Sequence, residues 1–410
     1  MRPSWILLLL CITFVANAQI TPEISSWILN TTGATGYNNI PSNVQKVQYS
    51  DSNVYVSASC IPGYDIGPWQ GNPNTPKNQN FVFKITRFPQ MNPATPINTG
   101  LGHIGVWTNG VSIYNPKDGM SYNNQNVWNQ NAIVVEGPSF DNCLGHPAPN
   151  GEYHHHLNPT CLYNDSLTTK HAPILGYAFD GFPVYGAFGY ANHDGTGGIK
   201  RMQSSFHLRN ITKRTTLPNG LPAASAGPDV STRFPLGYYV EDFEYLAGSG
   251  DLDEHNGRFC ITPEYPNGIY AYFVTLDSNL KAAYPYVLGI SYYGLVPAGN
   301  TGPGSGHNTI RETVITFNGT TEIKETKLNL DASIFGNPAK SIISITINEN
   351  APNNLKAVLI NLNGQPIQQW KYLQPGFHYS FDISEFENGL YFIKIFNDTF
   401  QQTKKIQIAH

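Results

Sequence analysis

Tight-turn dipeptides between short alternating segments constrain this fold most. Residues 105–114 read G-V-W-T-N-G-V-S-I-Y and turn at Asn109-Gly110, and residues 175–185 turn at Asp180-Gly181. Asn-Gly and Asp-Gly between alternating apolar residues are typical of β-hairpins. No stretch has the apolar spacing of an amphipathic helix longer than three turns. The sequence therefore predicts an all-β protein with a loop-rich core.

Composition narrows the class of protein. Charged residues make up 13% of the 410 residues and aromatic residues 12%, and there are 38 Gly and 30 Pro. A disordered chain would lack the aromatic residues, so we expect a compact protein of the secreted type. The net charge is only −4, with no basic run, which excludes nucleic-acid binding as a function.

The chain divides into four parts. Residues 1–18 have the Arg2, apolar core and Ala16-Asn17-Ala18 end of a signal peptide. That core is too short to span a bilayer, and we expect no transmembrane segment in the mature chain. Residues 19–296 form the predicted core domain. Residues 297–334 are predicted as a linker, rich in Gly at 299–306, with a bridging strand at 310–317. Residues 335–410 alternate in short segments, which predicts a small β-sandwich.

Four cysteines remain once the signal peptide is removed: Cys60, Cys143, Cys161 and Cys260. An even number in an exported chain predicts two disulfides, with three possible connectivities. Cys143 and Cys161 bracket a histidine run, so their bond would close a loop around it and leave Cys60 to pair with Cys260. The alternative is that some of the cysteines are thiolate metal ligands, although the chain has no C-x-x-C pair.

Histidines are concentrated between residues 143 and 186. In an extended strand, side chains at i and i+2 lie on one face, so His154 and His156 should point the same way. His146 lies within the loop closed by the predicted disulfide. We therefore predict that His146, His154 and His156 hold one transition-metal ion, with His171 as a weaker fourth ligand. Histidine ligation suits zinc and copper alike. His155 should point away from the site.

The same region resembles the YHYH family. The family's run is here Tyr153-His154-His155-His156, with His155 where the family has Tyr. G-P-W-Q-G-N-P near Trp69, G-H-I-G-V-W-T-N-G-V near Trp107 and T-P-E-Y-P-N-G-I-Y-A-Y-F before residue 274 match in order. The resemblance covers roughly residues 61–294. Because the family is defined by sequence, it implies no particular reaction.

The last 75 or so residues resemble the C-terminal sorting domain of the type IX secretion system of Bacteroidetes. The Asn337-Pro338 start, the L-N-G turn at 362–364, the D-I-S…N-G-L-Y run and the basic tail match. The resemblance implies recognition by an outer-membrane export machine, usually with removal of the module, and a secreted or cell-surface protein. An adhesive or carbohydrate-binding sandwich is the alternative.

Two classes of function remain open at this point. One is a metal-binding protein, either a simple binder or an enzyme that uses the ion. The other is a non-catalytic surface protein that binds a small-molecule or glycan ligand through aromatic residues, with structural histidines. Asp180 has a sufficient explanation in its turn, with a ligand or base role as the alternative, and we interpret His103 and His207 as structural. Residues 251–262 lack the Gly and Glu positions of an EF-hand. Neither a G-x-S-x-G motif nor a P-loop is present.

Overall fold

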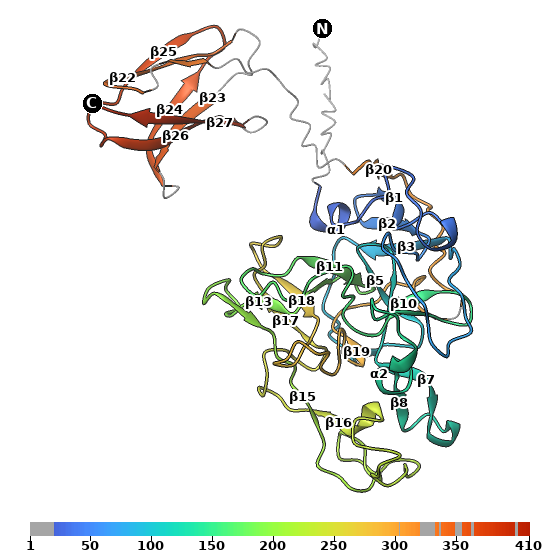
Figure 1. Cartoon of the computed structure of the whole chain (residues 1–410). Helices are drawn as coiled ribbons and strands as arrows, with labels where there is room; N and C mark the ends of the chain where they lie inside the picture. Colours follow the sequence, from blue (N-terminus) through green and yellow to red (C-terminus); the bar gives the residue numbers. More distant parts are fainter. Residues whose placement is uncertain are drawn as a thin grey trace, which may run out of the picture. The chain divides into compact units, whose positions relative to one another are not determined.

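The computed structural model describes residues 20–302, 304–319, 333–335, 338–348, 355–361, 365–397 and 401–410. The chain separates into two compact units, Met1–Gly319 and Thr320–His410 (Figure 1). The predicted signal peptide, Asn337 and the turn at 362–364 lie outside the described residues.

The first unit begins with a four-stranded sheet in the order β20-β1-β2-β3. Its strands are Val44–Tyr49 (β1), Asn53–Ala58 (β2), Phe81–Thr86 (β3) and Ile315–Phe317 (β20). β1 and β2 pair as an antiparallel hairpin. Alternate residues of β3 are buried, as its alternating sequence requires.

An eight-stranded mixed sheet carries the centre of this unit, in the order β17-β18-β12-β11-β5-β6-β10-β9 (Figure 1). The predicted hairpins are β5–β6 and β11–β12. The strands are His103–Trp107 (β5), Ser112–Tyr114 (β6), His146–Pro147 (β9), Tyr153–His155 (β10), Ile174–Ala178 (β11), Pro183–Tyr185 (β12), Gly257–Cys260 (β17) and Ile269–Phe273 (β18).

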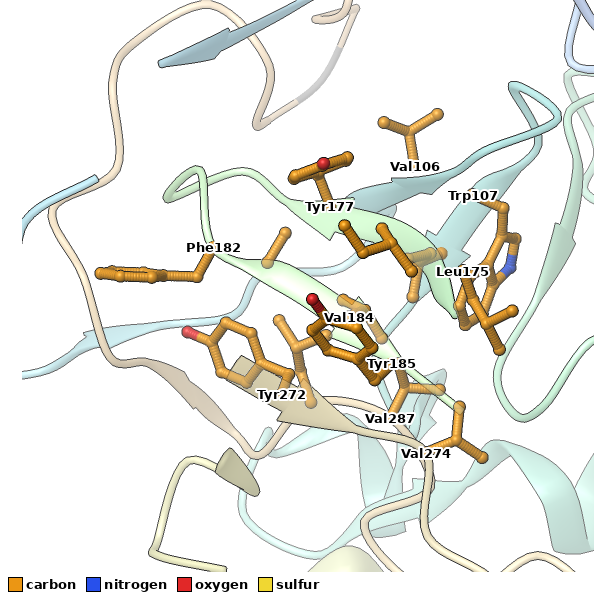
Figure 2. Close-up of a cluster of buried hydrophobic side chains, with 14 of the residues drawn as sticks. Val106, Trp107, Leu175, Tyr177, Phe182, Val184, Tyr185, Tyr272, Val274 and Val287 are labelled. Atoms are coloured by element: carbon orange, nitrogen blue, oxygen red, sulfur yellow. The ribbon is translucent and has the colours of Figure 1, made fainter. Parts of the chain in front are cut away.

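The core of the unit is packed with aromatic and β-branched side chains from these strands. Figure 2 shows Trp107, Tyr177, Tyr185 and Tyr272 among valine and leucine side chains from neighbouring strands. All four rings are fully buried. This packing accounts for the high aromatic content and gives the short strands a rigid base.

Small elements surround the sheet, and one of them differs from the prediction. Residues 132–136 read as a short apolar strand, but Ala132–Val135 forms a helical turn (α2). The side chain of Asn131 accepts a hydrogen bond from the Ile133 N–H and caps this turn. Local capping outweighs the strand preference of the β-branched residues. The other small elements are Pro22–Ser25 (α1), Ile97–Asn98 (β4), Lys117–Ser121 (β7), Asn129–Asn131 (β8), Phe188–Tyr190 (β13), Ile199–Arg201 (β14), Phe206–Leu208 (β15), Phe243–Tyr245 (β16), Ser291–Tyr292 (β19) and the 3-10 turns Tyr37–Asn39, Tyr122–Asn124, Gly137–Ser139 and Val240–Asp242.

The described residues between 297 and 319 belong to the first unit, contrary to the linker prediction. Asn300 is buried, and its side-chain amide both accepts from the Lys84 N–H at 3.0 Å and donates to the Lys84 carbonyl at 2.6 Å. Asn308 Nδ2 donates to the Val82 carbonyl at 2.9 Å. These amides form hydrogen bonds with the backbone groups at the edge of β3. Composition alone does not reveal this contact.

The second unit is a small two-sheet domain with its own core. One sheet has the order β21-β22-β25 and the other β24-β23-β26-β27. Buried isoleucines and leucines lie between them, including Ile345, Leu359 and Ile393. The predicted sandwich is therefore present. Its strands are Ser333–Phe335 (β21), Ile342–Thr346 (β22), Leu355–Asn361 (β23), Pro366–Leu373 (β24), His378–Asp382 (β25), Gly389–Phe396 (β26) and Gln401–Ile408 (β27).

Candidate metal centre

Strand register brings the histidines together. β9 runs antiparallel to β10, with His146 directly opposite His154. Directly opposed residues on antiparallel strands have Cβ atoms about 4.5–5.5 Å apart, so their rings can touch. His156 follows β10 two residues after His154 and lies on the same face, as the strand period predicts. Backbone pairing thus fixes three imidazoles around one point.

The three rings meet through their Nε2 atoms. Nε2 of His154 lies 3.1 Å from Nε2 of His146 and 3.1 Å from Nε2 of His156. All three side chains are buried, and one ligand atom from each lies within 4.8 Å of the others. Two nitrogens bound to a tetrahedral ion at 2.0–2.1 Å stand about 3.3 Å apart. The spacing fits a shared ion.

Backbone carbonyls fix the tautomers of two of these rings. His154 Nδ1 lies 3.1 Å from the carbonyl oxygen of Glu152, and His156 Nδ1 lies 2.6 Å from that of Asn115. A carbonyl oxygen only accepts, so each Nδ1 must carry the hydrogen and donate it. In a neutral imidazole this leaves Nε2 with a lone pair, which is the form that binds a metal.

A hydroxyl fixes the third ring in the same way. His146 Nδ1 lies 2.8 Å from Ser139 Oγ. Ser139 Oγ donates its own hydrogen to the carbonyl of Glu136 at 2.8 Å, so it accepts from His146. The Asn72 side-chain nitrogen is farther from Nδ1, at 3.4 Å. His146 therefore also presents a lone pair at Nε2.

Burial keeps the rings of His146 and His154 neutral. Burial, together with the neighbouring His156, lowers the pKa of His146 to about 4. Burial also lowers the pKa of His154 well below its usual value, and the neighbouring His146 and His156 lower it further. Withdrawal from water disfavours the imidazolium, so His146 and His154 are metal-competent bases at neutral pH.

Family models match both parts of the chain. Residues 82–284 match the model described as YHYH protein, and residues 333–409 match that of the Secretion system C-terminal sorting domain. The chain thus contains a YHYH domain and a C-terminal sorting domain. A comparison with curated proteins gives no match. The sorting domain indicates handling by the type IX secretion machinery and export to the cell surface or the medium. Within the described residues, no helix has the length and apolarity needed to cross a membrane.

We call His146, His154 and His156 the YHYH triad. His171, predicted as a fourth ligand, is not part of it. Its ring packs on Tyr185, Tyr190 and Phe273, and its Nδ1 contacts the Ala172 carbonyl at 2.7 Å. Tyr185, which His171 contacts, lies on β12, whereas His154 lies on β10. These two strands are four positions apart in the sheet, which is roughly 19 Å at ordinary strand spacing. The prediction was wrong because His171 follows a loop whose path the sequence does not reveal.

His155 lies on the opposite face, as predicted. It is fully buried, and its ring lies 5.3 Å from that of Tyr153. The Tyr153 hydroxyl donates to Asp141 Oδ2 at 2.9 Å, and Asp141 Oδ1 also accepts from the Cys143 and Gly145 N–H groups. Asp141 thus ties β10 to the turn that delivers His146. The run Asp-Asn-Cys-Leu-Gly at 141–145 carries the signal for this role, because an Asp side chain commonly accepts from backbone N–H groups of the turn that follows it.

One predicted disulfide is present and the other is not. Cys143 and Cys161 are bonded, with Cα atoms 5.1 Å apart. Cys60 and Cys260 are buried free thiols. Cys60 Sγ donates to the Tyr153 carbonyl at 3.0 Å, beneath β10, whereas Cys260 ends β17 at the other edge of the sheet. A disulfide needs Cα atoms within about 7 Å, so pairing by elimination was wrong.

A carboxylate that the sequence did not point to closes one side of the triad. Glu136 Oε2 lies 3.0 Å from Nε2 of His156 and 3.6 Å from that of His146. Its side chain is 28% exposed and lines a cavity of about 510 Å³ together with the three histidines and Asp118. Burial and the Glu136 charge raise the pKa of Asp118.

Aromatic rings hold the triad in place. The ring of Tyr114 stacks on His154 with centroids 3.8 Å apart and planes 18° apart. Phe140 packs edge-on against His146 at 4.8 Å. Such contacts restrict ring rotation, so the nitrogens stay aimed at one point.

Asp180, considered from the sequence as a ligand or base, and Asp253 are both structural. Asp180 is fully buried and its Oδ2 accepts from the Tyr272 hydroxyl at 2.5 Å and the Gly294 N–H at 2.9 Å. Asp253 Oδ1 accepts from the His255 N–H and the Tyr270 hydroxyl, both at 2.9 Å. Each carboxylate joins distant segments of the backbone.

Proposed function

We propose that the YHYH domain of this exported protein binds one transition-metal ion, zinc or copper, through Nε2 of His146, His154 and His156. Glu136 and Asp118 supply acid–base groups beside the ion, which favours a hydrolytic metalloenzyme. The observation that carries the proposal is that each Nδ1 faces an acceptor, so all three Nε2 lone pairs converge.

The electrostatics of the cluster support a cation. Three Nε2 lone pairs and the Glu136 carboxylate meet at separations of 3.0–3.6 Å. Within the described residues, Glu136 Oε2 is buried and has no aligned hydrogen-bond donor. Four acceptors in contact, with no hydrogen between them, repel one another. A divalent ion at their centre removes this cost.

The chemistry follows from the groups around the cavity. A bound zinc or copper ion polarises an oxygen and acidifies water that reaches it. The Glu136 carboxylate beside the ion can take up a proton, and the raised pKa of Asp118 favours a carboxyl that can donate one. Two neighbouring carboxyl groups, one ionised and one protonated, are a common acid–base arrangement.

A second function, binding of a glycan-type ligand, has its own feature. A cavity of about 770 Å³ is lined by Phe206, Phe243, Tyr245 and Tyr284 together with Glu241. Flat aromatic and polar side chains are the groups that contact sugars. In this case the histidines would be structural and the protein would carry no metal.

Elemental analysis separates the two functions. Protein purified without a histidine tag should contain about one zinc or copper ion per chain after reconstitution. The double variant His154→Ala/His156→Ala should contain none, because one remaining imidazole cannot hold the ion. His171→Ala is the matched control, since this half-buried histidine lies outside the triad and should leave the stoichiometry unchanged.

Two results would contradict the proposal. One is a folded native protein that takes up no zinc or copper. The other is unchanged stoichiometry in the double variant, provided that its circular dichroism matches that of the native protein.

A further inference from the structure

Another buried histidine, His103, lies beside the triad and has different hydrogen-bond partners. His103 Nδ1 lies 2.8 Å from Glu152 Oε1, and His103 Nε2 lies 2.9 Å from Ser305 Oγ. His103 and Glu152 are both buried, and Ser305 is half-buried. Serine, imidazole and carboxylate are thus connected in a line by two hydrogen-bond distances.

The carboxylate fixes the orientation of the imidazole. Glu152 Oε1 also accepts from Ser112 Oγ at 2.5 Å. Glu152 Oε1 also faces His103 Nδ1 as an acceptor, so His103 Nδ1 carries a hydrogen and Nε2 faces the serine. A carboxylate in this position also stabilises an imidazolium when Nε2 takes up a proton.

The serine hydroxyl has three neighbours that can accept its single hydrogen. They are His103 Nε2 and the carbonyl oxygens of Gly302, at 2.6 Å, and Asn300, at 3.0 Å. Asn300 packs its loop against β3, so Ser305 is held at a fixed place. Rotation of the hydroxyl toward His103 gives a nucleophile–base pair. Such constellations are recognised by geometry, and a G-x-S-x-G motif is not required.

The three residues open on a cavity that can take a substrate. It has a volume of about 570 Å³, and Phe81, Leu101 and Tyr114 give it apolar walls. Asn150 also lines the cavity, and its Nδ2 donates to Glu152 Oε2 at 3.5 Å. Leu101 and Tyr114 also line the metal cavity, so the two cavities adjoin.

We propose that Ser305, His103 and Glu152 form a second hydrolytic site that cleaves carboxylic esters with an apolar acyl group. Ser305 Oγ attacks the ester carbon while its proton passes to His103 Nε2. The bond to the alcohol oxygen breaks, and the alcohol leaves with that proton. Water then attacks the acyl-serine and returns a proton through His103, which releases the acid and restores Ser305. One ester and one water yield one acid and one alcohol.

A fluorophosphonate probe tests this site directly. Ser305 Oγ should displace fluoride from phosphorus, with its proton passing to His103, and mass spectrometry should find the adduct on the Ser305 peptide. Ser305→Ala should abolish labelling, and His103→Asn should slow it by about 100-fold or more. Addition of EDTA should leave the labelling rate unchanged, which separates this site from the proposed metal centre.

The chain contains a matched control for a serine that merely touches an imidazole. Ser249 Oγ lies 2.8 Å from His207 Nε2 and, like Ser305, contacts backbone carbonyls. Among the described residues, no carboxylate forms an ion pair with His207. Ser249 should stay unlabelled, and Ser249→Ala should label like the native protein.

Three outcomes would overturn the proposal. One is no adduct on Ser305 in folded protein when a known serine hydrolase is labelled in parallel. Another is undiminished labelling of Ser305→Ala, and the third is loss of labelling on chelation.

Discussion

The two histidine sites of the YHYH domain share walls and one residue, yet they are suited to different chemistry. In the triad, every Nδ1 donates to a neutral acceptor, whereas Nδ1 of His103 faces a carboxylate. A neutral acceptor leaves a neutral ring with a free lone pair, and three such rings converge. A carboxylate favours the protonated ring, so His103 can accept a proton. The partner of Nδ1 therefore sets the role of each imidazole.

Glu152 contributes to both sites through different atoms. Its carbonyl oxygen accepts from His154, and its carboxylate accepts from His103. The backbone contact comes with the path of the strand and survives any side-chain change. The two sites can therefore be perturbed separately by substitution at one position.

Of the changes proposed in this section, Glu152→Gln should lower the free energy of unfolding most. The change removes the charged acceptor of two buried hydrogen bonds, from His103 and Ser112, each worth about 1.5–3 kcal/mol, and we expect the free energy of unfolding to fall by about 4 kcal/mol. The carbonyl that holds His154 is unaffected, so the folded variant should still bind one metal ion. Urea unfolding and elemental analysis measure the two quantities on one preparation. Loss of the metal together with the stability would contradict the separation of the two sites.

Acid should destabilise the triad in a defined pH window. The pKa of His146 is depressed to about 4 by burial, against about 6.5 in the unfolded chain. Unfolding therefore takes up a proton between these values, and stability that is complete above pH 6.5 is lost as pH falls toward 4. His146 alone accounts for about 3 kcal/mol in metal-free protein.

This pH window distinguishes the triad from the site formed by His103, Glu152 and Ser305. Glu152 has a lowered pKa, so its contribution is present above the unfolded value of about 4.5 and is lost only below it. Urea titrations of metal-free protein at pH 7, 5.5 and 4.5 should show a decline that His146→Gln reduces and Glu152→Gln does not. Stability independent of pH between 7 and 4.5 would show that the triad is not held neutral.

Ser139→Ala should give a smaller effect, confined to the triad. It removes the acceptor of His146 Nδ1 and leaves all three metal-binding nitrogens in place. Loss of such a partner typically lowers metal affinity by about 10- to 100-fold. Competition with a chromophoric chelator measures the change, and Ser121→Ala is the control, because Ser121 lies outside the metal cavity. Equal affinities in the two variants would show that Nδ1 partners do not matter here.

Periodic and local features of the protein could be predicted from the sequence. The hairpins at Asn109-Gly110 and Asp180-Gly181 follow from turn chemistry, and the common face of His154 and His156 follows from the strand period. Cys143 and Cys161 are close in sequence, so their bond was predictable too.

Features that depend on tertiary placement could not be predicted. Glu136 reaches the triad from the end of a helical turn that the sequence favours as a strand. Ser305 meets His103 across 202 residues, from a segment whose composition resembles a linker. Cys60 and Cys260 were paired by elimination, without knowledge of the strand order that separates them. The prediction of His171 as a ligand was made without that strand order too.

X-ray absorption at the metal edge tests the central claim most directly, because it counts the ligands of the bound ion. Zinc- or copper-loaded protein should show three imidazole nitrogens at about 2.0–2.1 Å, and the scattering of the outer imidazole ring atoms should identify them as histidine. His154→Ala should lose that pattern, and His171→Ala should keep it. A first shell of oxygen atoms only, or with a single imidazole, would contradict convergence of the three Nε2 lone pairs on one ion.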